Sequence, residues 1–201
     1  MTKDLSTEDR ILQAARRVFL NKGLEGSRMQ DIADAAGINK AMLHYYFRNK
    51  EKLFETIFNQ VIDGFLPRIF GILDGDDLLF EKIRKFCSAY IEQELETPYV
   101  PFFIISEINR DPRAFLQKVL KGKKPPLRKV TQQIEDDIKK RRIKHFQPVE
   151  LLLTVLSLCV FPFLARPMLQ AVTGMNMKHF SALMEKRKLE LPDMIIQHIK
   201  A

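Results

Sequence analysis

The sequence predicts an all-α fold, and three observations support that prediction. Apolar residues make up 46% of the 201 residues, enough to build a buried core. They recur three and four residues apart, as on one face of a helix, whereas strand-like alternation is rare. Capping residues, glycines and prolines separate these amphipathic segments. We expect a small N-terminal domain, residues 1–50, and a larger helical domain, residues 51–201.

The first helix has clear start and stop signals. Ser6 and Asp9 have the spacing of a capping box, in which each satisfies a free amide of the first turn. Gly23 is the expected stop, because glycine readily adopts the left-handed conformation that ends helices. One apolar face lies between these signals, formed by Ile11, Ala15, Val18 and Phe19.

Two short helices joined by a glycine turn follow over residues 27–47. Ser27 is the expected N-cap of the first, with Gln30 as its reciprocal partner, and Gly37 ends it. Asn39 is the expected N-cap of the second. This spacing predicts a helix-turn-helix, a motif whose second helix enters the major groove of DNA.

Residues 51–201 are predicted to form further helices, most of them bounded by prolines. The first begins after Asn49 and ends at Pro67, and the apolar helix from Pro148 is expected to kink near Pro162 and Pro167. The expected helices after Pro67 cover residues 78–95, 102–109, 114–120, 127–142, 148–171, 177–188 and 192–200.

Charge and cysteine usage narrow the class of protein. The net charge of +8 suits a polyanionic partner without proving one. Cys87 and Cys159 lie in apolar stretches without CxxC spacing, which is typical of reduced core residues. The longest uncharged stretch, residues 151–165, is shorter than the roughly 20 residues that span a bilayer. We therefore expect a cytoplasmic chain with no membrane partner.

No motif favours an enzyme. The four histidines are scattered without ligand spacing, and no HExxH or ExxH pattern is present. The sequence also has no GxSxG elbow and no phosphate-binding glycine loop. We expect a protein without catalytic residues, metal or cofactor.

Residues 11–54 resemble the DNA-binding signature of the tetracycline-repressor (TetR) family along their whole length. His44 and Tyr46 depart from the pattern, since the family usually has tyrosine at the first position and histidine at the second. Both exchanges keep a polar planar group, so the resemblance implies DNA binding more firmly than any particular operator. The matching residues are Ala14, Ala15, Phe19, Gly23, Ile32, Ala33, Ala36, Gly37, Leu43, Tyr45, Phe47, Lys50 and Leu53.

The DNA contacts expected from this resemblance divide into two groups. Phosphate contacts position the protein, and contacts to base edges select the sequence. Because one short helix reads few base pairs, we expect a homodimer on a palindromic double-stranded operator. The expected phosphate contacts are Ser27, Tyr45, Tyr46 and Lys50. The expected base contacts are Arg28, Asn39, Lys40, Ala41, Met42 and His44.

The resemblance also implies an effector-binding and dimerising domain. It assigns residues 149–171 and 177–188 to a four-helix dimer interface, although helical spacing alone does not separate a dimer face from a monomer core. Fifteen phenylalanines favour a small apolar or amphipathic effector that releases the repressor from DNA. The expected pocket residues are Phe86, Tyr90, Phe102, Phe103, Ser106, Glu107, Asn109, Arg110 and Phe163.

Two other functions stay open at this stage. A nonspecific or architectural DNA binder would account for the charge but not for the large apolar domain. A helical small-molecule carrier without a regulatory role would leave the helix-turn-helix unexplained. Residues 118–144 hold eleven basic and three acidic residues, which we interpret as a solvated face, with a second nucleic-acid patch as the alternative.

Overall fold

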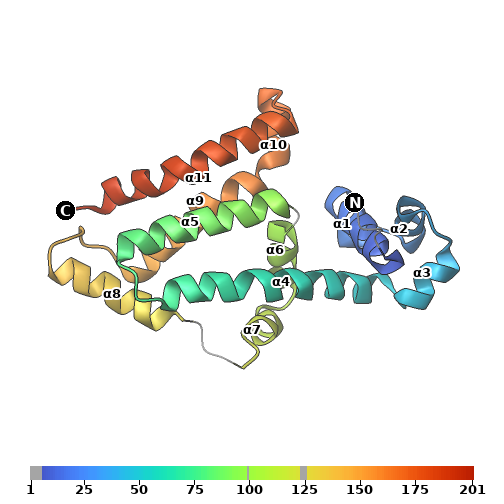
Figure 1. Cartoon of the computed structure of the whole chain (residues 1–201), viewed down its shortest axis with the longest axis horizontal. Coiled ribbons are helices and arrows are strands. Elements are labelled where there is room, and N and C mark those ends of the chain that lie inside the picture. The colour runs from blue at the N-terminus through green and yellow to red at the C-terminus, as the bar shows by residue number, and fades with distance from the viewer. Residues whose placement is uncertain (1–5, 99, 123–125) are drawn as a thin grey trace. The chain divides into compact units, whose positions relative to one another are not determined.

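The described part of the chain is helical, as the sequence predicts. A computed structural model describes residues 6–98, 100–122 and 126–201. These residues form eleven α-helices, α1 to α11, and no strand (Figure 1). One isolated antiparallel bridge joins Ile143 to Lys200 near the C-terminus. The all-α fold class is confirmed.

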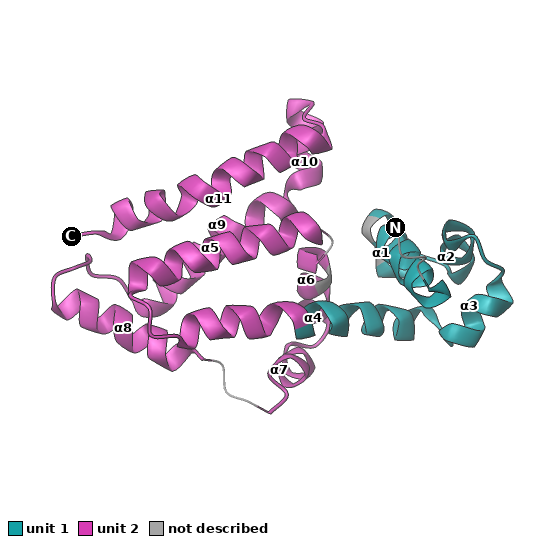
Figure 2. Cartoon of the chain, in the orientation of Figure 1, with its two compact units in different colours: residues 1–63 teal, residues 64–201 magenta. Residues whose placement is uncertain are grey.

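The chain divides into two compact units, residues 1–63 and 64–201 (Figure 2). The sequence pattern instead places the domain boundary after residue 50. Helix α4 (Lys50–Asp74) accounts for the difference, because its first part belongs to the N-terminal unit. Leu53 and Ile57 are fully buried there, and the Phe54 ring meets the Phe19 ring of α1 edge to face, with centroids 5.7 Å apart.

Local signals set most boundaries of α1 (Thr7–Gly26). The Ser6 hydroxyl accepts the Asp9 amide at 3.1 Å, which confirms the predicted cap. The helix continues through Gly23 to Gly26, beyond the expected stop. An interior glycine costs a helix only about 1 kcal/mol, which the buried apolar face of α1 outweighs.

The next two helices are α2 (Met29–Ala36) and α3 (Lys40–Tyr46). The predicted N-cap of α2 is wrong by one residue: Arg28 caps it, and its amide donates to the Asp31 carboxylate at 3.1 Å. Gly37 ends α2 with φ +66°, and the Asn39 side chain accepts the Met42 amide at 2.7 Å, as predicted for a cap of α3.

The second unit contains the rest of α4 and seven further helices. Two prolines expected to break helices lie inside them: α4 continues past Pro67, and α11 continues past Pro192. Pro192 is buried in the core, so the packing around it outweighs the lost hydrogen bond. The helices are α5 (Leu79–Glu96), α6 (Val100–Arg110), α7 (Pro112–Leu120), α8 (Leu127–Lys139), α9 (Pro148–Leu164), α10 (Arg166–Thr173) and α11 (Met177–Ile199).

Helix α5 is the centre of the second unit, where it contacts α8, α9 and α11 (Figure 1). Its buried face includes Ile83, Cys87 and Ile91, which belong to one apolar core with residues of the other three helices. Helices α9 and α10 meet at a bend of 58°, which confirms the predicted kink near the prolines. None of the described helices is by itself long and apolar enough to cross a membrane, although the bent pair α9–α10 reaches that threshold together.

Replacing Gly37 with alanine should destabilise the N-terminal unit by about 1–2 kcal/mol. No atom lies within 4 Å of the added Cβ, so the cost comes from the left-handed backbone alone. Urea unfolding followed by circular dichroism measures it. Gly71→Ala is the matched control, because Gly71 is helical with equally open surroundings and the variant should gain about 0.5–1 kcal/mol. Equal effects of the two changes would contradict the strain at Gly37.

Candidate nucleic-acid interface

Helix α3 exposes nearly all of its side chains. Of its seven residues only Leu43 is buried, and Phe47 directly after the helix is buried as well. These two side chains hold the helix against the unit. The six exposed residues are Lys40, Ala41, Met42, His44, Tyr45 and Tyr46. A helix held by one buried row leaves the rest of its surface available to a partner.

Some polar groups on and beside α3 already form hydrogen bonds within the protein, and others do not. The Asn39 side-chain oxygen is occupied by the cap, which limits the predicted base contact of this residue to its amide hydrogens. The His44 ring Nδ1 lies 3.1 Å from the Arg48 carbonyl oxygen, which orients the ring. Tyr45 is 85% exposed, and its ring meets the Tyr46 ring edge to face, with centroids 5.5 Å apart. No partner of Lys40 is present among the described contacts, so its ammonium group is open to solvent.

Lys50 has a role that its sequence position does not reveal. Its ammonium group lies 3.0 Å from the carbonyl oxygen of Leu24, 3.4 Å from that of Glu25 and 3.5 Å from that of Ser27. The Leu24 carbonyl is the nearest of these three acceptors. In this arrangement Lys50 joins the start of α4 to the end of α1, so its ammonium group already has partners within the protein.

Ser27 and Arg28 also differ from each other. Ser27 is buried, with 2% of its surface exposed, so its hydroxyl is poorly placed for the predicted phosphate contact. Arg28 is exposed at the start of α2. Beside it, the Asp31 carboxylate forms an ion pair with the ammonium group of Lys22 of α1, with 3.0 Å between Oδ1 and Nζ. The hydrogen bonds from Lys22 and from the Arg28 amide lower the pKa of Asp31, so the carboxylate stays ionised and links α1 to α2.

The predicted effector residues do not form one group. Phe86, Tyr90 and Phe163 are buried in the core of the second unit. The Phe86 and Tyr90 rings stack at 5.6 Å, whereas Phe163 meets Phe180 of α11 edge to face. On α6, Phe102, Ser106, Asn109 and Arg110 are exposed, and the Phe103 side chain lies outside the described part of the structure.

Glu107, predicted as a polar anchor, is already paired. Its side chain is 8% exposed and accepts the Arg110 guanidinium at 2.8 Å. This contact spans one helical turn and pairs the two predicted anchors with each other. Both stay unassigned as ligand contacts in this arrangement.

Sequence reasoning missed Glu94, a fully buried acid on α5. Neither of its carboxylate oxygens has a hydrogen-bond partner in the structure. Burial raises the pKa of Glu94 to about 9, since the charged form has lost its water. It also lies close enough to Tyr90, one turn earlier, to help raise the pKa of that phenol, after the larger effect of burial. The signal was present in the sequence, because Glu94 continues the helical spacing of Cys87 and Tyr90.

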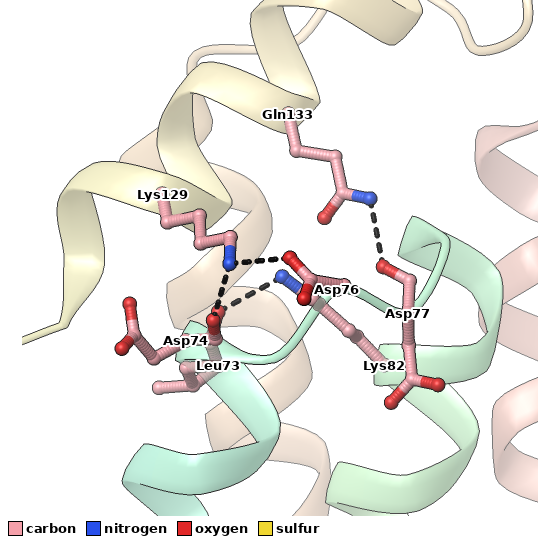
Figure 3. A network of polar contacts seen from close by, with 7 residues as sticks. All are labelled: Leu73, Asp74, Asp76, Asp77, Lys82, Lys129 and Gln133. Atoms are coloured by element: carbon pink, nitrogen blue, oxygen red, sulfur yellow. Dashed lines mark hydrogen bonds and ion pairs between the residues drawn. The ribbon is translucent and has the colours of Figure 1, made fainter.

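A cluster of polar side chains surrounds the end of α4 (Figure 3). The cluster lines a cavity of about 630 Å³. Lys82 donates to the Leu73 carbonyl at 2.9 Å, and Lys129 donates to the Asp74 carbonyl and to the Asp76 carboxylate, both at 2.7 Å. Burial and the nearby Lys129 lower the pKa of Lys82. These lysines bind the free carbonyls with which α4 ends.

The same contacts clarify the basic stretch of residues 118–144. Lys129 is paired with Asp76, and Arg142 with Asp137 at 3.2 Å. Lys144 donates to the His198 carbonyl at 2.8 Å. Several of these cations are therefore part of the folded structure, which favours the interpretation of a structural and solvated face over a second nucleic-acid patch.

Comparison with known proteins identifies the first unit. Residues 11–57 match the family model described as bacterial regulatory proteins, tetR family. This stretch of the chain is similar to the regulatory proteins of the tetR family. The match covers the three helices of the helix-turn-helix unit and the start of α4. The resemblance inferred from the sequence is thereby confirmed.

Individual tetR-family proteins match over different lengths. The transcriptional repressor KstR2 of Mycolicibacterium smegmatis is 33% identical over 87 residues, which are 43% of this chain and 42% of that repressor. The chain therefore matches less than half the length of this relative. The repressor NicS of Pseudomonas putida is 41% identical over 59 residues, 29% of this chain and 28% of the repressor. Both relatives are transcriptional repressors rather than enzymes.

Solved structures extend the likeness to the whole fold. The ketosteroid transcriptional regulator KstR2 of Mycobacterium tuberculosis superimposes with a TM-score of 0.73 at 16% identity, over 99% of this chain and 97% of that one. AibR, solved in complex with isovaleryl coenzyme A and operator DNA, superimposes with a TM-score of 0.62 at 21% identity, over 79% of this chain and 86% of that one. The second unit therefore has the helical fold of these regulators.

Removing the ionisable group of Glu94 should stabilise the chain more as the pH rises. Its pKa is about 9 in the folded chain against 4.5 for the ordinary carboxyl, so the folded state binds the proton more tightly. The stability tied to this proton is complete below about pH 4.5 and is lost as the pH rises towards 9. Each pKa unit is worth about 1.4 kcal/mol. Glu94→Gln should thus gain stability over the unmodified chain between pH 5 and pH 9.

Urea unfolding at pH 5, 7 and 9 tests this expectation. Glu92→Gln is the control, because Glu92 lies on the same helix but is exposed and paired with Arg68 at 2.6 Å. Its difference from the unmodified chain should not grow in favour of the variant with pH, since Arg68 lowers the pKa of Glu92. A constant difference for Glu94→Gln across the three pH values would show that the carboxyl is hydrated or paired in solution.

Proposed function

We propose that the chain is a homodimeric transcriptional repressor that binds a palindromic operator through α3 and releases it when a small effector binds the second unit. The observation that carries the proposal is a tetR-family helix-turn-helix whose second helix keeps six of seven side chains exposed. A surface helix that only covered a core would bury a wider stripe. The relatives KstR2 and NicS, both repressors, support repression as the direction of control.

The exposed residues divide between base edges and phosphates. Lys40 can donate to guanine O6 or N7, and Ala41 or Met42 can contact a thymine methyl group. His44 completes the base-reading group. Arg28, Tyr45 and Tyr46 have exposed donors for phosphates, whereas the buried Ser27 and the occupied Lys50 hold the helices in position. This assignment moves two predicted phosphate contacts into a supporting role.

Exposed apolar side chains on α9, α10 and α11 support the homodimer. Such side chains on one run of helices are typical of an interface, because a monomer rarely leaves so many in water. A two-fold pairing would present two copies of α3 to a palindrome. The exposed residues are Val149, Leu153, Leu156, Phe161, Met168, Val172, Met177, Leu183, Leu189 and Met194.

Helix α4 supplies the link between effector and DNA. Its first residue, Lys50, binds the carbonyls at the end of α1, and its last turn is bound by Lys82 and Lys129. An effector that prefers one arrangement of the second unit would shift α4 and, with it, the DNA-binding unit. The complex of AibR with isovaleryl coenzyme A supports a small-molecule effector for a protein of this fold.

Lys50→Ala should weaken operator binding without changing its salt dependence. The variant frees three carbonyls at the end of α1 and loosens the position of α3, but it removes no phosphate contact. Fluorescence anisotropy between 50 and 200 mM salt, on an operator identified by footprinting, measures both quantities. Arg28→Ala is the comparison, and it should flatten the slope of log K against log salt by about one unit. A slope change of that size for Lys50→Ala would return Lys50 to the phosphate contacts.

Leu153→Glu should convert the dimer to monomers and reduce operator affinity. Leu153 is 63% exposed on α9, so a charge there costs the monomer little and a buried apolar interface much. Sedimentation velocity gives the oligomeric state. Leu116→Glu is the control, because Leu116 is 51% exposed on α7, away from the proposed interface, and should leave the dimer intact. A monomeric unmodified chain with no site-selective DNA binding would overturn the proposed function.

A further inference from the structure

Glu94 is a buried acid whose partners are missing from the structure. It is fully buried, and among the described residues neither of its carboxylate oxygens has a hydrogen-bond partner. Burying a carboxyl group without such partners costs several kcal/mol, so natural chains rarely keep one without a function. Other buried acids of the second unit are paired, Glu107 with Arg110 and Asp137 with Arg142. The exception at Glu94 therefore needs an explanation.

Glu94 lies close to Tyr90, a residue that belongs to a group of aromatic rings. Tyr90, one turn earlier on α5, stacks on Phe86 at 5.6 Å and meets the Phe65 ring of α4 edge to face at 5.1 Å. Helix α9, which packs against α5, contributes Cys159, which lies close enough to Glu94 for an electrostatic interaction. Aromatic faces beside an acid are the environment in which proteins bind organic cations, through the ring quadrupole and the opposite charge together.

The charged and titratable groups near Glu94 do not supply a counter-ion. Tyr90 and Cys159 are neutral at ordinary pH, because burial raises the pKa of the phenol, and the hydrogen bond with the Cys87 thiol, followed by burial, raises the pKa of Cys159. Cys87 is the hydrogen-bond partner of Cys159. Arg187 of α11 lies near the two thiols, but its guanidinium donates to the Leu158 carbonyl at 3.0 and 3.3 Å. In the described part of the chain, none of these groups donates a hydrogen bond to the Glu94 carboxyl group.

We propose that Glu94 is the recognition residue for an effector in which a protonated amine is attached to an apolar body. This inference rests on the proposed function, since it names the chemistry of the small molecule that the second unit binds. The ammonium group would donate to the two unpartnered carboxylate oxygens, and the apolar body would lie among aromatic side chains such as Phe86 and Tyr90. Neutral or anionic molecules of the same shape would leave the carboxylate unpaired.

Proton balance gives this proposal a specific signature. The carboxyl group of Glu94 is protonated at neutral pH, because its pKa is about 9 in the empty protein. Binding of the ammonium form leaves Glu94 as a carboxylate paired with R–NH₃⁺, and the carboxyl proton passes to the buffer. The binding enthalpy at pH 7.5 must then depend on the ionisation enthalpy of the buffer, with release of close to one proton.

Three probes of equal length test the proposal: octylamine, octanol and octanoate, titrated calorimetrically into the full-length chain in two buffers. The unmodified chain should bind octylamine at least tenfold more tightly than octanol or octanoate, with proton release. Glu94→Gln should lose both the tenfold preference and the proton release, while octanol binds both forms alike. Glu92→Gln, on the same helix but exposed, should behave as the unmodified chain.

Circular dichroism establishes that each variant is folded, and Glu94→Leu replaces Glu94→Gln should the latter unfold. Octylamine binding without preference over octanol, or without proton release, would overturn the proposal. Fluorescence anisotropy with operator DNA separates the two inferences. A neutral or anionic molecule that releases DNA equally from the unmodified chain and Glu94→Gln would keep the repressor function and discard the role of Glu94. Selective amine binding that leaves operator affinity unchanged would keep the site and overturn its role in effector release.

Discussion

The structure depends on how the free carbonyl groups at helix ends are satisfied. Each helix ends with four carbonyls that have no partner within the helix, and a lysine side chain can reach several of them at once. Lys50 lies within hydrogen-bond distance of three carbonyls at the end of α1 in the first unit, and Lys82 and Lys129 each bind one carbonyl at the end of α4 in the second. Because α4 begins with Lys50 and ends under the other two lysines, both of its ends are fixed by the same kind of contact.

The same arrangement frees α3 for recognition. Two buried residues, Leu43 and Phe47, and the Asn39 cap hold α3 in position. The other side chains of the helix are exposed and are not needed for its packing. The contacts of Lys50 at the start of α4 then set where α3 lies within the first unit. In the proposed interface, the residues that position α3 and the residues that would contact DNA are different, although the sequence places them within a dozen positions of one another.

Local chemistry predicted much of the fold, and long-range contacts account for what it did not. The Ser6 and Asn39 caps and the turn at Gly37 depend on neighbours within a few residues, and all three are confirmed. The predictions that one helix ends at Pro67 and another begins at Pro192 were wrong, because packing of the surrounding helix outweighs one lost hydrogen bond. The contacts of Lys50 join positions more than twenty residues apart, which no spacing rule reports.

Glu94 and Glu107 illustrate why the site was harder to predict than the fold. Both are acids on helices with apolar faces, and the sequence pattern suggested the second as a ligand anchor. Glu107 has an arginine three residues later and is paired with it, whereas the residue three positions after Glu94 is Thr97, whose hydroxyl donates to the Gln93 carbonyl instead. Glu94 is fully buried, and no cation among the described residues forms a hydrogen bond with it. The role of a buried acid can be inferred only when the elements around it are known, because only then can one say whether the protein supplies a partner for its carboxyl group.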